Sequence, residues 1–179
     1  MNSIGLPADA PQETQLLIAF ADLTLFTRTA RTMSDAELAE FCQGFYERIV
    51  APVDRAGGRV VKFMGDAALI VFPRALADAG ARCLLDLTGS LDRWLTERGV
   101  PCRLVVKAHA GTAMMGVFGA GATRQLDIIG SEVNLTARLD SSGFALSVQG
   151  FRALSPQTRR LFKKHTPPVT YIPLAQRHD

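Results

Sequence analysis

Cysteines are few in this sequence, and it has no long hydrophobic run. The three cysteines, Cys42, Cys83 and Cys102, stand apart from one another and form no C-x-x-C pair. This excludes a disulfide framework and a cysteine zinc site, and it predicts buried thiols of a reducing compartment. No apolar run approaches the roughly 18 residues that a membrane span needs. No basic residue precedes Arg28, which argues against a secretory signal. We therefore expect a cytoplasmic protein with no membrane span.

Aromatic residues and clusters of like charge are also scarce. Aromatics make up 7% of the 179 residues, and the lysines and arginines are scattered. Nucleic-acid binding favours clustered basic residues with stacking aromatics, so we expect no nucleic-acid partner. The net charge of +3 instead suits a site for a phosphorylated small molecule.

The remaining composition is that of an ordinary globular protein. The chain is 47% hydrophobic and 21% charged, and its length allows one domain with a substantial core. Residues 1–13 are polar and contain Pro7 and Pro11, so we expect a flexible leader there. A single domain is expected over residues 14–179.

Hydrophobic periodicity predicts alternating strands and helices. Ser34, Ser131 and Ser155 are expected to cap helices, Ser34 in a capping box with Glu37, and residues 111–112 are expected to turn a second hairpin. The order predicts an α+β fold with a ferredoxin-like βαββαβ core, extra C-terminal strands and helices, and a largely antiparallel central sheet. Strands are expected at 15–23, 59–63, 67–72, 103–110, 113–118, 126–129, 144–148 and 169–174, and helices at 34–52, 75–98, 131–139 and 155–162.

The first hairpin, residues 57–73 (GGRVVKFMGDAALIVFP), carries two polar residues in unusual places. Gly65 permits the positive φ of a tight turn, and Asp66 stands beside it at the tip. Lys62 interrupts an apolar strand, where an unpaired ammonium group is costly to bury. The pattern leaves two interpretations open. One is a surface hairpin with a solvated acid and a snorkelling lysine; the other is an acid that binds a metal ion and a lysine that binds a partner or ligand.

A second acid, Asp22, stands near the end of the apolar strand 15–23. In a ferredoxin-like sheet this strand end can meet Asp66. Two carboxylates held together repel unless a cation joins them, so a hard metal such as Mg²⁺ is expected. Two acids with two metals are a common device for in-line displacement at phosphorus. The alternative is two unrelated loop acids.

The segment 126–140, LDIIGSEVNLTARLD, carries a third set of polar residues. Asn134 and Arg138 are four residues apart and project from one helix face. They can orient a sugar and stabilise a crowded phosphoryl group, although a solvated polar face is the other interpretation. Asp127 lies in an apolar strand. Asp127 and Lys62 are thus an acid and a base, both in apolar strands. Either they neutralise each other as a structural pair, or they hydrogen-bond the polar edge of a ligand such as adenine.

Three ordered blocks of the sequence resemble the class III nucleotide cyclase catalytic domains, the adenylyl and guanylyl cyclase family. The family's F-x-D-[IL]-x-G-F-[TS] is matched by FADLTLFT at 20–27. G-G-x-x-x-K-x-x-G-D is matched by GGRVVKFMGD at 57–66, and D-x-x-G-x-x-V-N-x-[AG]-[AS]-R-[LM] by DIIGSEVNLTARL at 127–139. The three blocks are specific together, whereas none would be alone.

The resemblance implies an adenylyl cyclase that converts ATP to 3′,5′-cyclic AMP and pyrophosphate. In this family the ribose 3′-oxygen attacks the α-phosphorus in line. Asp22 and Asp66, helped by the Leu23 carbonyl, match the ligands of two Mg²⁺ or Mn²⁺ ions. Phe26 and Thr27 lie in the loop that contacts the triphosphate through backbone amides.

The resemblance also assigns the nucleotide contacts and implies an assembly. Lys62 and Asp127 match the adenine-reading pair, Asn134 the residue that orients the ribose, and Arg138 the residue that stabilises the transition state. In this family one subunit supplies the two acids and the other supplies these four residues. The expected partner is therefore a second copy of the chain, in a homodimer with two equivalent interface sites.

Two departures from the family pattern leave alternatives open. Leu25 stands where the first block has glycine, and the tail lacks the family's frequent Lys-Gly. One alternative is therefore a catalytically weak nucleotide-binding or dimerising regulatory module. A guanylyl cyclase is disfavoured, because Asp127 would repel the guanine carbonyl, and a different metal-dependent phosphoryl-transfer enzyme is a third alternative. Regulation is expected from an unidentified domain, protein or ion.

Overall fold

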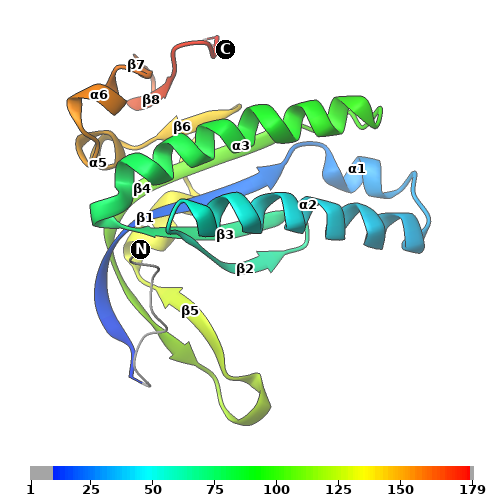
Figure 1. The fold of residues 1–179 in the computed structure, drawn as a ribbon, viewed down its shortest axis with the longest axis horizontal. Helices are drawn as coiled ribbons and strands as arrows, with labels where there is room; N and C mark the ends of the chain where they lie inside the picture. Colours follow the sequence, from blue (N-terminus) through cyan, green and yellow to red (C-terminus); the bar gives the residue numbers. More distant parts are fainter. Residues whose placement is uncertain (1–9, 178–179) are drawn as a thin grey trace.

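The longest apolar runs of the sequence pair with one another at the centre of an eight-stranded sheet (Figure 1). The computed structural model describes residues 10–177. The strand order is β2-β3-β1-β4-β6-β8-β7, with β5 paired to β4 off this path. Every pairing is antiparallel except the parallel pairing of β4 with β6. The strands are β1 (Gln12–Leu23), β2 (Arg59–Met64), β3 (Ala67–Pro73), β4 (Leu104–Phe118), β5 (Gln125–Ile129), β6 (Phe144–Leu146), β7 (Phe162–His165) and β8 (Thr170–Pro173).

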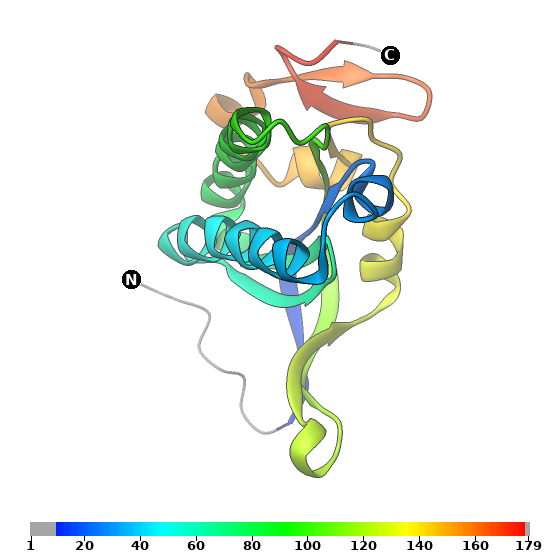
Figure 2. The same cartoon turned by 90° about the vertical axis from the view of Figure 1, so that its right-hand side faces the viewer.

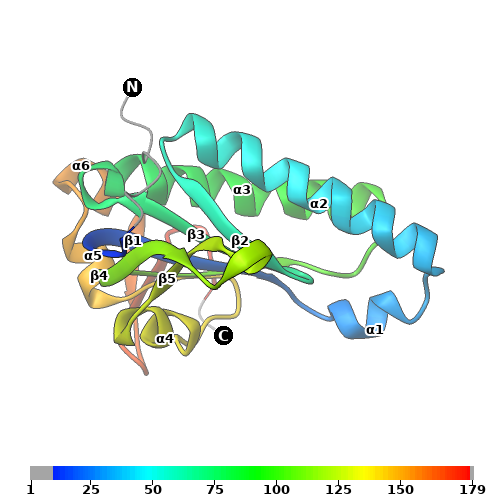
Figure 3. The same cartoon turned by 90° about the horizontal axis from the view of Figure 1, so that it is seen from below.

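The helices divide between the two faces of this sheet. The α-helices are α1 (Phe26–Ala30), α2 (Asp35–Arg55), α3 (Ala77–Glu97), α4 (Ser131–Ala137), α5 (Val148–Arg152) and α6 (Pro156–Arg159), and two short 3₁₀ turns span Arg74–Leu76 and Gly121–Thr123. Figure 3 shows α2 and α3 on one face and α4 on the other. With α2 and α3 as the connections between strands β1 to β4, the strand order confirms the predicted α+β fold with its ferredoxin-like core.

Side-chain alternation along β1 gives each face its own core. Leu17 and Ala19 are buried against the α2 and α3 side, whereas Leu16 and Ile18 are buried against the side of β5 and α4. Because β1 is buried on both faces, it reads as a continuous apolar run in the sequence. The outer ends of β4 and β5 extend beyond these layers as a long hairpin (Figure 2).

Two of the three predicted helix caps are present. The capping box of α2 is present, since the Glu37 N–H donates to Ser34 Oγ (3.3 Å) and the Ser34 N–H to Glu37 Oε2 (2.8 Å). Ser155 caps α6 by accepting from the Thr158 N–H. Ser131 does not cap α4, because the residue before this helix is Gly130 and no side chain caps it. None of the helices among residues 10–177 is both long and apolar enough to cross a membrane.

The predicted second hairpin at 103–118 is wrong, because β4 is one continuous strand of 15 residues. Gly111 does not turn the chain; it pairs with Leu16 in a register that continues along β1. The boundary of the predicted leader also moves, since β1 begins at Gln12 and pairs Glu13 with Met114. Residues 1–9 of that leader lie outside the described residues. The short elements α1, α5 and β7 were not predicted at all.

Candidate active site

Two aspartates meet where β1 ends and the β2–β3 hairpin turns. Asp22 pairs with Ala67, the first residue of β3, and Asp66 directly precedes it in the turn. Desolvation at the strand end raises the pKa of Asp22 above its ordinary value, and the Asp66 carboxyl raises it further through its charge and as a hydrogen-bond partner. The Leu23 backbone and Lys107 act in the opposite direction. The structure thus brings the two predicted acids together.

Contacts from α2 hold the tip of this hairpin. Gly65 adopts a φ of 65°, in the left-handed region that glycine enters without strain. The Tyr46 hydroxyl donates a 2.8 Å hydrogen bond to the Gly65 carbonyl. The Tyr46 ring also stacks on Phe63 of β2, with ring centroids 3.9 Å apart. Tyr46 therefore anchors the turn beside Asp66, and sequence reasoning missed this residue.

The loop after Asp22 keeps a glycine-like turn although it lacks glycine. Leu25 has a φ of 57° and stands as the N-cap of α1. Thr24 ties the loop to Arg103, whose N–H donates to Thr24 Oγ1 and whose carbonyl accepts from the Thr24 N–H, both at 2.9 Å. Phe26 and Thr27 form the first turn of α1, where helix N–H groups lack an intrahelical partner. Leu25 thus adopts the backbone conformation that a glycine at this position would favour.

A β-bulge directs Lys62 to the face of the sheet that carries β5. The register of β2 against β3 shifts between Val60, opposite Ile70, and Lys62, opposite Leu69. Without the shift, Lys62 would lie opposite the next residue, Ala68, and point toward α2 and α3. Leu69 belongs to the core on the β5 and α4 side, so Lys62 points there.

On that face Lys62 forms an ion pair with Asp127 of β5. Lys62 Nζ lies 2.6 Å from Asp127 Oδ2, and the two side chains are 35% and 16% exposed. The other carboxylate oxygen of Asp127 accepts from the Ile128 N–H at 2.8 Å. The predicted acid and base are therefore in direct contact in the folded chain, with the ammonium group partly open to solvent.

Asn134 and Arg138 lie on α4, on the same side of the sheet. Both are exposed, and the Arg138 N–H donates to the Asn134 carbonyl at 3.3 Å, one turn apart. Arg138 is the C-cap of the helix. The four-residue spacing predicted a shared helix face, and their common exposure on α4 agrees with it.

Apart from Leu23, Phe26 and Thr27, which follow Asp22 along the chain, the predicted site residues occur as three groups within one chain. They are the acid pair, the Lys62–Asp127 pair and the exposed positions of α4. Among residues 10–177, no hydrogen bond or ion pair joins the acid pair to the other two groups. Lys107 of β4 lies near both the acid pair and α4, since it lowers the pKa of Asp22 and its Nζ donates to the Ala137 carbonyl at 3.3 Å. Sequence reasoning missed Lys107, although it interrupts an apolar strand as Lys62 does.

The acid pair fits a hard divalent cation. Within the described part of the chain no group of three or more His, Cys, Asp or Glu side chains could hold a metal. Two carboxylates alone suit Mg²⁺ or Mn²⁺, which complete their shell with water, carbonyl and phosphate oxygens. Desolvation raises the pKa of Asp22 most and the Asp66 charge raises it further, and a bound cation would relieve the repulsion between the two carboxylates.

Comparisons with known proteins identify the family of the chain. Residues 8–170 match the adenylate and guanylate cyclase catalytic domain family, so the chain belongs to that family. It is 31% identical over 137 residues to adenylate cyclase 2 of Rhizobium meliloti, covering 73% of this chain and 38% of that protein. It is 35% identical over 127 residues to an adenylate cyclase of Streptomyces coelicolor, covering 71% of this chain and 30% of that protein. The chain thus spans less than two fifths of either relative.

A solved structure shares the fold. The adenylyl cyclase CyaB from P. aeruginosa superimposes with a TM-score of 0.79 at 19% identity, covering 94% of this chain and 98% of that chain. At this identity the likeness supports the fold alone, which is that of a cyclase catalytic domain.

Proposed function

We propose that the chain is an adenylyl cyclase, converting ATP to 3′,5′-cyclic AMP and pyrophosphate. The observation that carries the proposal is the placement of Asp22 at the end of β1 beside the β2–β3 turn that holds Asp66, because two carboxylates brought together favour binding of divalent cations that neutralise them. Membership of the cyclase family and the adenylate cyclases among its relatives support the same reaction.

The acid pair would hold two Mg²⁺ or Mn²⁺ ions with help from the Leu23 carbonyl. When bound, the cations supply charge neutralisation and polarisation at the α-phosphate. Phe26 and Thr27 offer backbone N–H groups to the triphosphate at the first turn of α1. Leu25, in its left-handed conformation, keeps this turn in place.

The residues of α4 act on the reacting part of the nucleotide. Asn134 orients the ribose by hydrogen bonding, which brings the 3′-oxygen toward the α-phosphorus. Arg138 presents a planar fork of donors to the phosphoryl oxygens and stabilises the charge that develops during attack. Both side chains are exposed, as residues that act on a substrate from another subunit need to be.

Lys62 and Asp127 select adenine over guanine. Adenine presents a donor amino group and a ring acceptor, which the Asp127 carboxylate and the Lys62 ammonium complement. Guanine presents a carbonyl where adenine has the amino group, and Asp127 would repel it. The pair is already oriented by its 2.6 Å contact and would exchange part of that contact for the base.

The proposed site is composite, with the acids from one subunit and Lys62, Asp127, Asn134 and Arg138 from the other. No hydrogen bond or ion pair joins the acid pair to the other residues within the described part of one chain, and a two-fold homodimer with two equivalent sites would bring them together across its interface. Because ATP and free thiols both belong to the cytoplasm, the proposal places the enzyme there.

An assay of cyclic nucleotide formation with ATP or GTP, at several enzyme concentrations, tests the proposal. We expect activity with Mg²⁺ or Mn²⁺, a preference for ATP, and a specific activity that rises with concentration as dimers form. A preference for GTP would reassign the chain as a guanylyl cyclase. Nucleotide binding without turnover would favour the catalytically weak module.

A mixing experiment tests the composite site directly. Asp66→Asn and Arg138→Ala are each expected to be inactive alone. In an equal mixture, half of the dimers are mixed and each contains one intact site, so roughly one quarter of wild-type activity should return. If each site were built within one chain, the mixture would stay inactive.

A further inference from the structure

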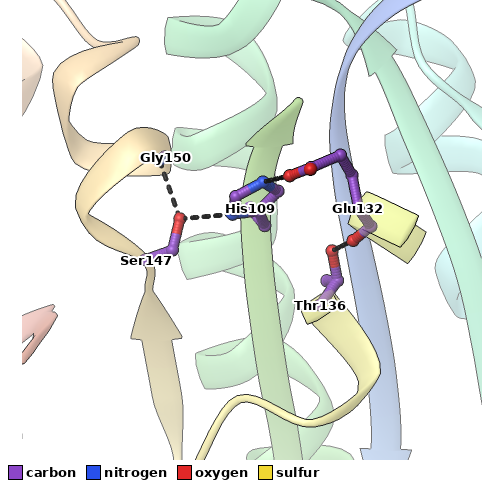
Figure 4. A network of polar contacts seen from close by, with 5 residues as sticks. All are labelled: His109, Glu132, Thr136, Ser147 and Gly150. Carbon is purple, nitrogen blue, oxygen red and sulfur yellow. Dashed lines mark hydrogen bonds and ion pairs between the residues drawn. The ribbon is translucent and has the colours of Figure 1, made fainter. Parts of the chain in front are cut away.

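A buried histidine links the sheet to the helix that carries Asn134 and Arg138. His109 of β4 is 0% exposed. Its Nδ1 lies 2.8 Å from Ser147 Oγ and its Nε2 lies 2.5 Å from Glu132 Oε2. Figure 4 shows the ring between Ser147, which precedes α5, and Glu132 of α4. The roles proposed above use none of these three residues.

The partners of the ring determine where its proton lies. An ionised Glu132 only accepts hydrogen bonds, so His109 Nε2 carries the proton that is shared with it. Ser147 Oγ already accepts from the Gly150 N–H at 2.9 Å, which leaves its hydroxyl proton for Nδ1 when the ring is neutral. The contact from His109 to Glu132 therefore exists whether the ring is neutral or charged.

Glu132 lies in the first turn of α4 and packs closely on β4. A Cβ at Gly111 would come within 2.8 Å of Glu132 Cγ, so only glycine leaves room for this side chain. The Glu132 carbonyl accepts from Thr136 Oγ1 at 2.7 Å, and Thr136 is fully buried. The hydrogen bond lies within the helix, whereas the close approach at Gly111 and the burial of Thr136 fix which face of α4 packs on the sheet.

The far end of α4 is tied to the same strand. Lys107 Nζ donates to the Ala137 carbonyl at 3.3 Å. Lys107 and His109 are two residues apart on β4, opposite Phe20 and Ile18 of β1, so their side chains share one face of the sheet. The helix has seven residues, and helices this short depend on tertiary contacts for their position.

We propose that His109 is a positioning residue for the cyclase reaction, acting through Glu132 to fix α4 and thereby Asn134 and Arg138. This inference rests on the proposed function for its catalytic consequence, whereas the effect on α4 does not depend on it. A small displacement of α4 would misplace the ribose-orienting amide and the guanidinium without removing either.

Glu132→Ala tests the link, and Glu132→Gln is the conservative variant, since its amide oxygen still accepts from Nε2. We expect Glu132→Ala to lower kcat by about 10- to 100-fold with little change in the KM for ATP, because the base-reading pair stays intact. Glu132→Gln should stay within about 3-fold of wild type, because the acceptor is kept. Ser155→Ala removes the cap of α6, which no hydrogen bond among residues 10–177 joins to α4, and serves as the control for lost stability alone.

Amide hydrogen exchange gives a readout that needs no turnover. The N–H groups of Asn134 and Arg138, bonded within and at the end of α4, should exchange faster in Glu132→Ala and not in Ser155→Ala. If the wild-type protein makes no cyclic nucleotide, the proposed function and the catalytic role of His109 both fail, while exchange still decides whether the contact fixes α4. Unchanged exchange, or a kcat no lower than that of Ser155→Ala, would overturn the inference.

Discussion

Lys62 donates a 2.6 Å hydrogen bond to Asp127 across the β2 and β5 strands, and it reaches β5 only because β2 bulges between Val60 and Lys62. A bulge that turns one lysine to the opposite face of a sheet is a local irregularity with a specific result. The contact fits either a purely structural ion pair or a pair of side chains already oriented to hydrogen-bond the adenine base. The two interpretations predict different outcomes when the charges are exchanged.

The charge-exchanged double variant Lys62→Glu/Asp127→Lys keeps an ion pair but reverses its donors and acceptors. We expect a melting temperature close to that of wild type and a kcat/KM for ATP at least about 100-fold lower, because the base edge now meets the wrong groups. Asp127→Ala is the matched control. It should lose activity and also about 1 kcal/mol of stability, since the pair is partly exposed. If the double variant turned over ATP at the wild-type rate, the pair would have only a structural role.

The acid pair predicts opposite effects on stability and activity for Asp66→Asn. Desolvation and Asp66 raise the pKa of Asp22 above 3.8, so folding disfavours the ionised carboxylate. The contribution of protonated Asp22 to the free energy of unfolding is fully present below pH 3.8. It is lost as the pH rises through the raised pKa of Asp22. Removing the Asp66 charge should therefore raise the melting temperature of the metal-free protein, by an amount that grows with pH across this window.

The same variant should lose its response to metal. We expect millimolar Mn²⁺ to raise the melting temperature of wild type and not of Asp66→Asn, because the cation binds the folded acid pair. Cyclase activity should fall by at least about 100-fold. Thermal denaturation with and without Mn²⁺ measures the first effect. An equal shift in both proteins would remove Asp66 from the metal site.

Tyr46→Phe tests whether catalysis depends on the hydrogen bond from Tyr46 to the tip of the β2–β3 hairpin. The variant keeps the stack on Phe63 and loses the hydroxyl that donates to the Gly65 carbonyl. We expect a loss of about 0.5–1.5 kcal/mol of stability and a roughly 3- to 10-fold lower kcat, because Asp66 follows Gly65 directly. Gln43→Ala removes an exposed hydrogen bond from the same helix and should change neither quantity. Wild-type kcat in Tyr46→Phe would show that the tip needs no such support.

Much of the fold could be predicted because its signals are local. The apolar run of β1 and the capping box of Ser34 and Glu37 each depend on neighbouring residues. The meeting of Asp22 with Asp66 followed from the ferredoxin-like strand order, which the pattern of elements already indicated. These parts required no knowledge of individual side-chain contacts.

The missed features depend on contacts between distant residues. Gly111 was expected to turn the chain. Its missing side chain instead leaves room for Glu132, which packs on it from α4. His109 finds its partners 23 and 38 residues away, so no local spacing could reveal its role. The bulge before Lys62 is likewise invisible in a sequence that simply reads as apolar.

Leu25→Gly tests the cost of a left-handed backbone at the proposed phosphate loop. A non-glycine residue at a φ of 57° is strained by roughly 1–2 kcal/mol, and glycine relieves this at the expense of a more flexible unfolded chain. Leu25 is 55% exposed, so little packing is lost. We expect a net gain of about 0.5–1 kcal/mol in denaturant unfolding, with activity within about 2-fold of wild type because the turn keeps its shape. Leu25→Ala removes the same side chain but keeps the strain, and it should give no gain. If both variants were equally stable, the backbone conformation would not be the cause.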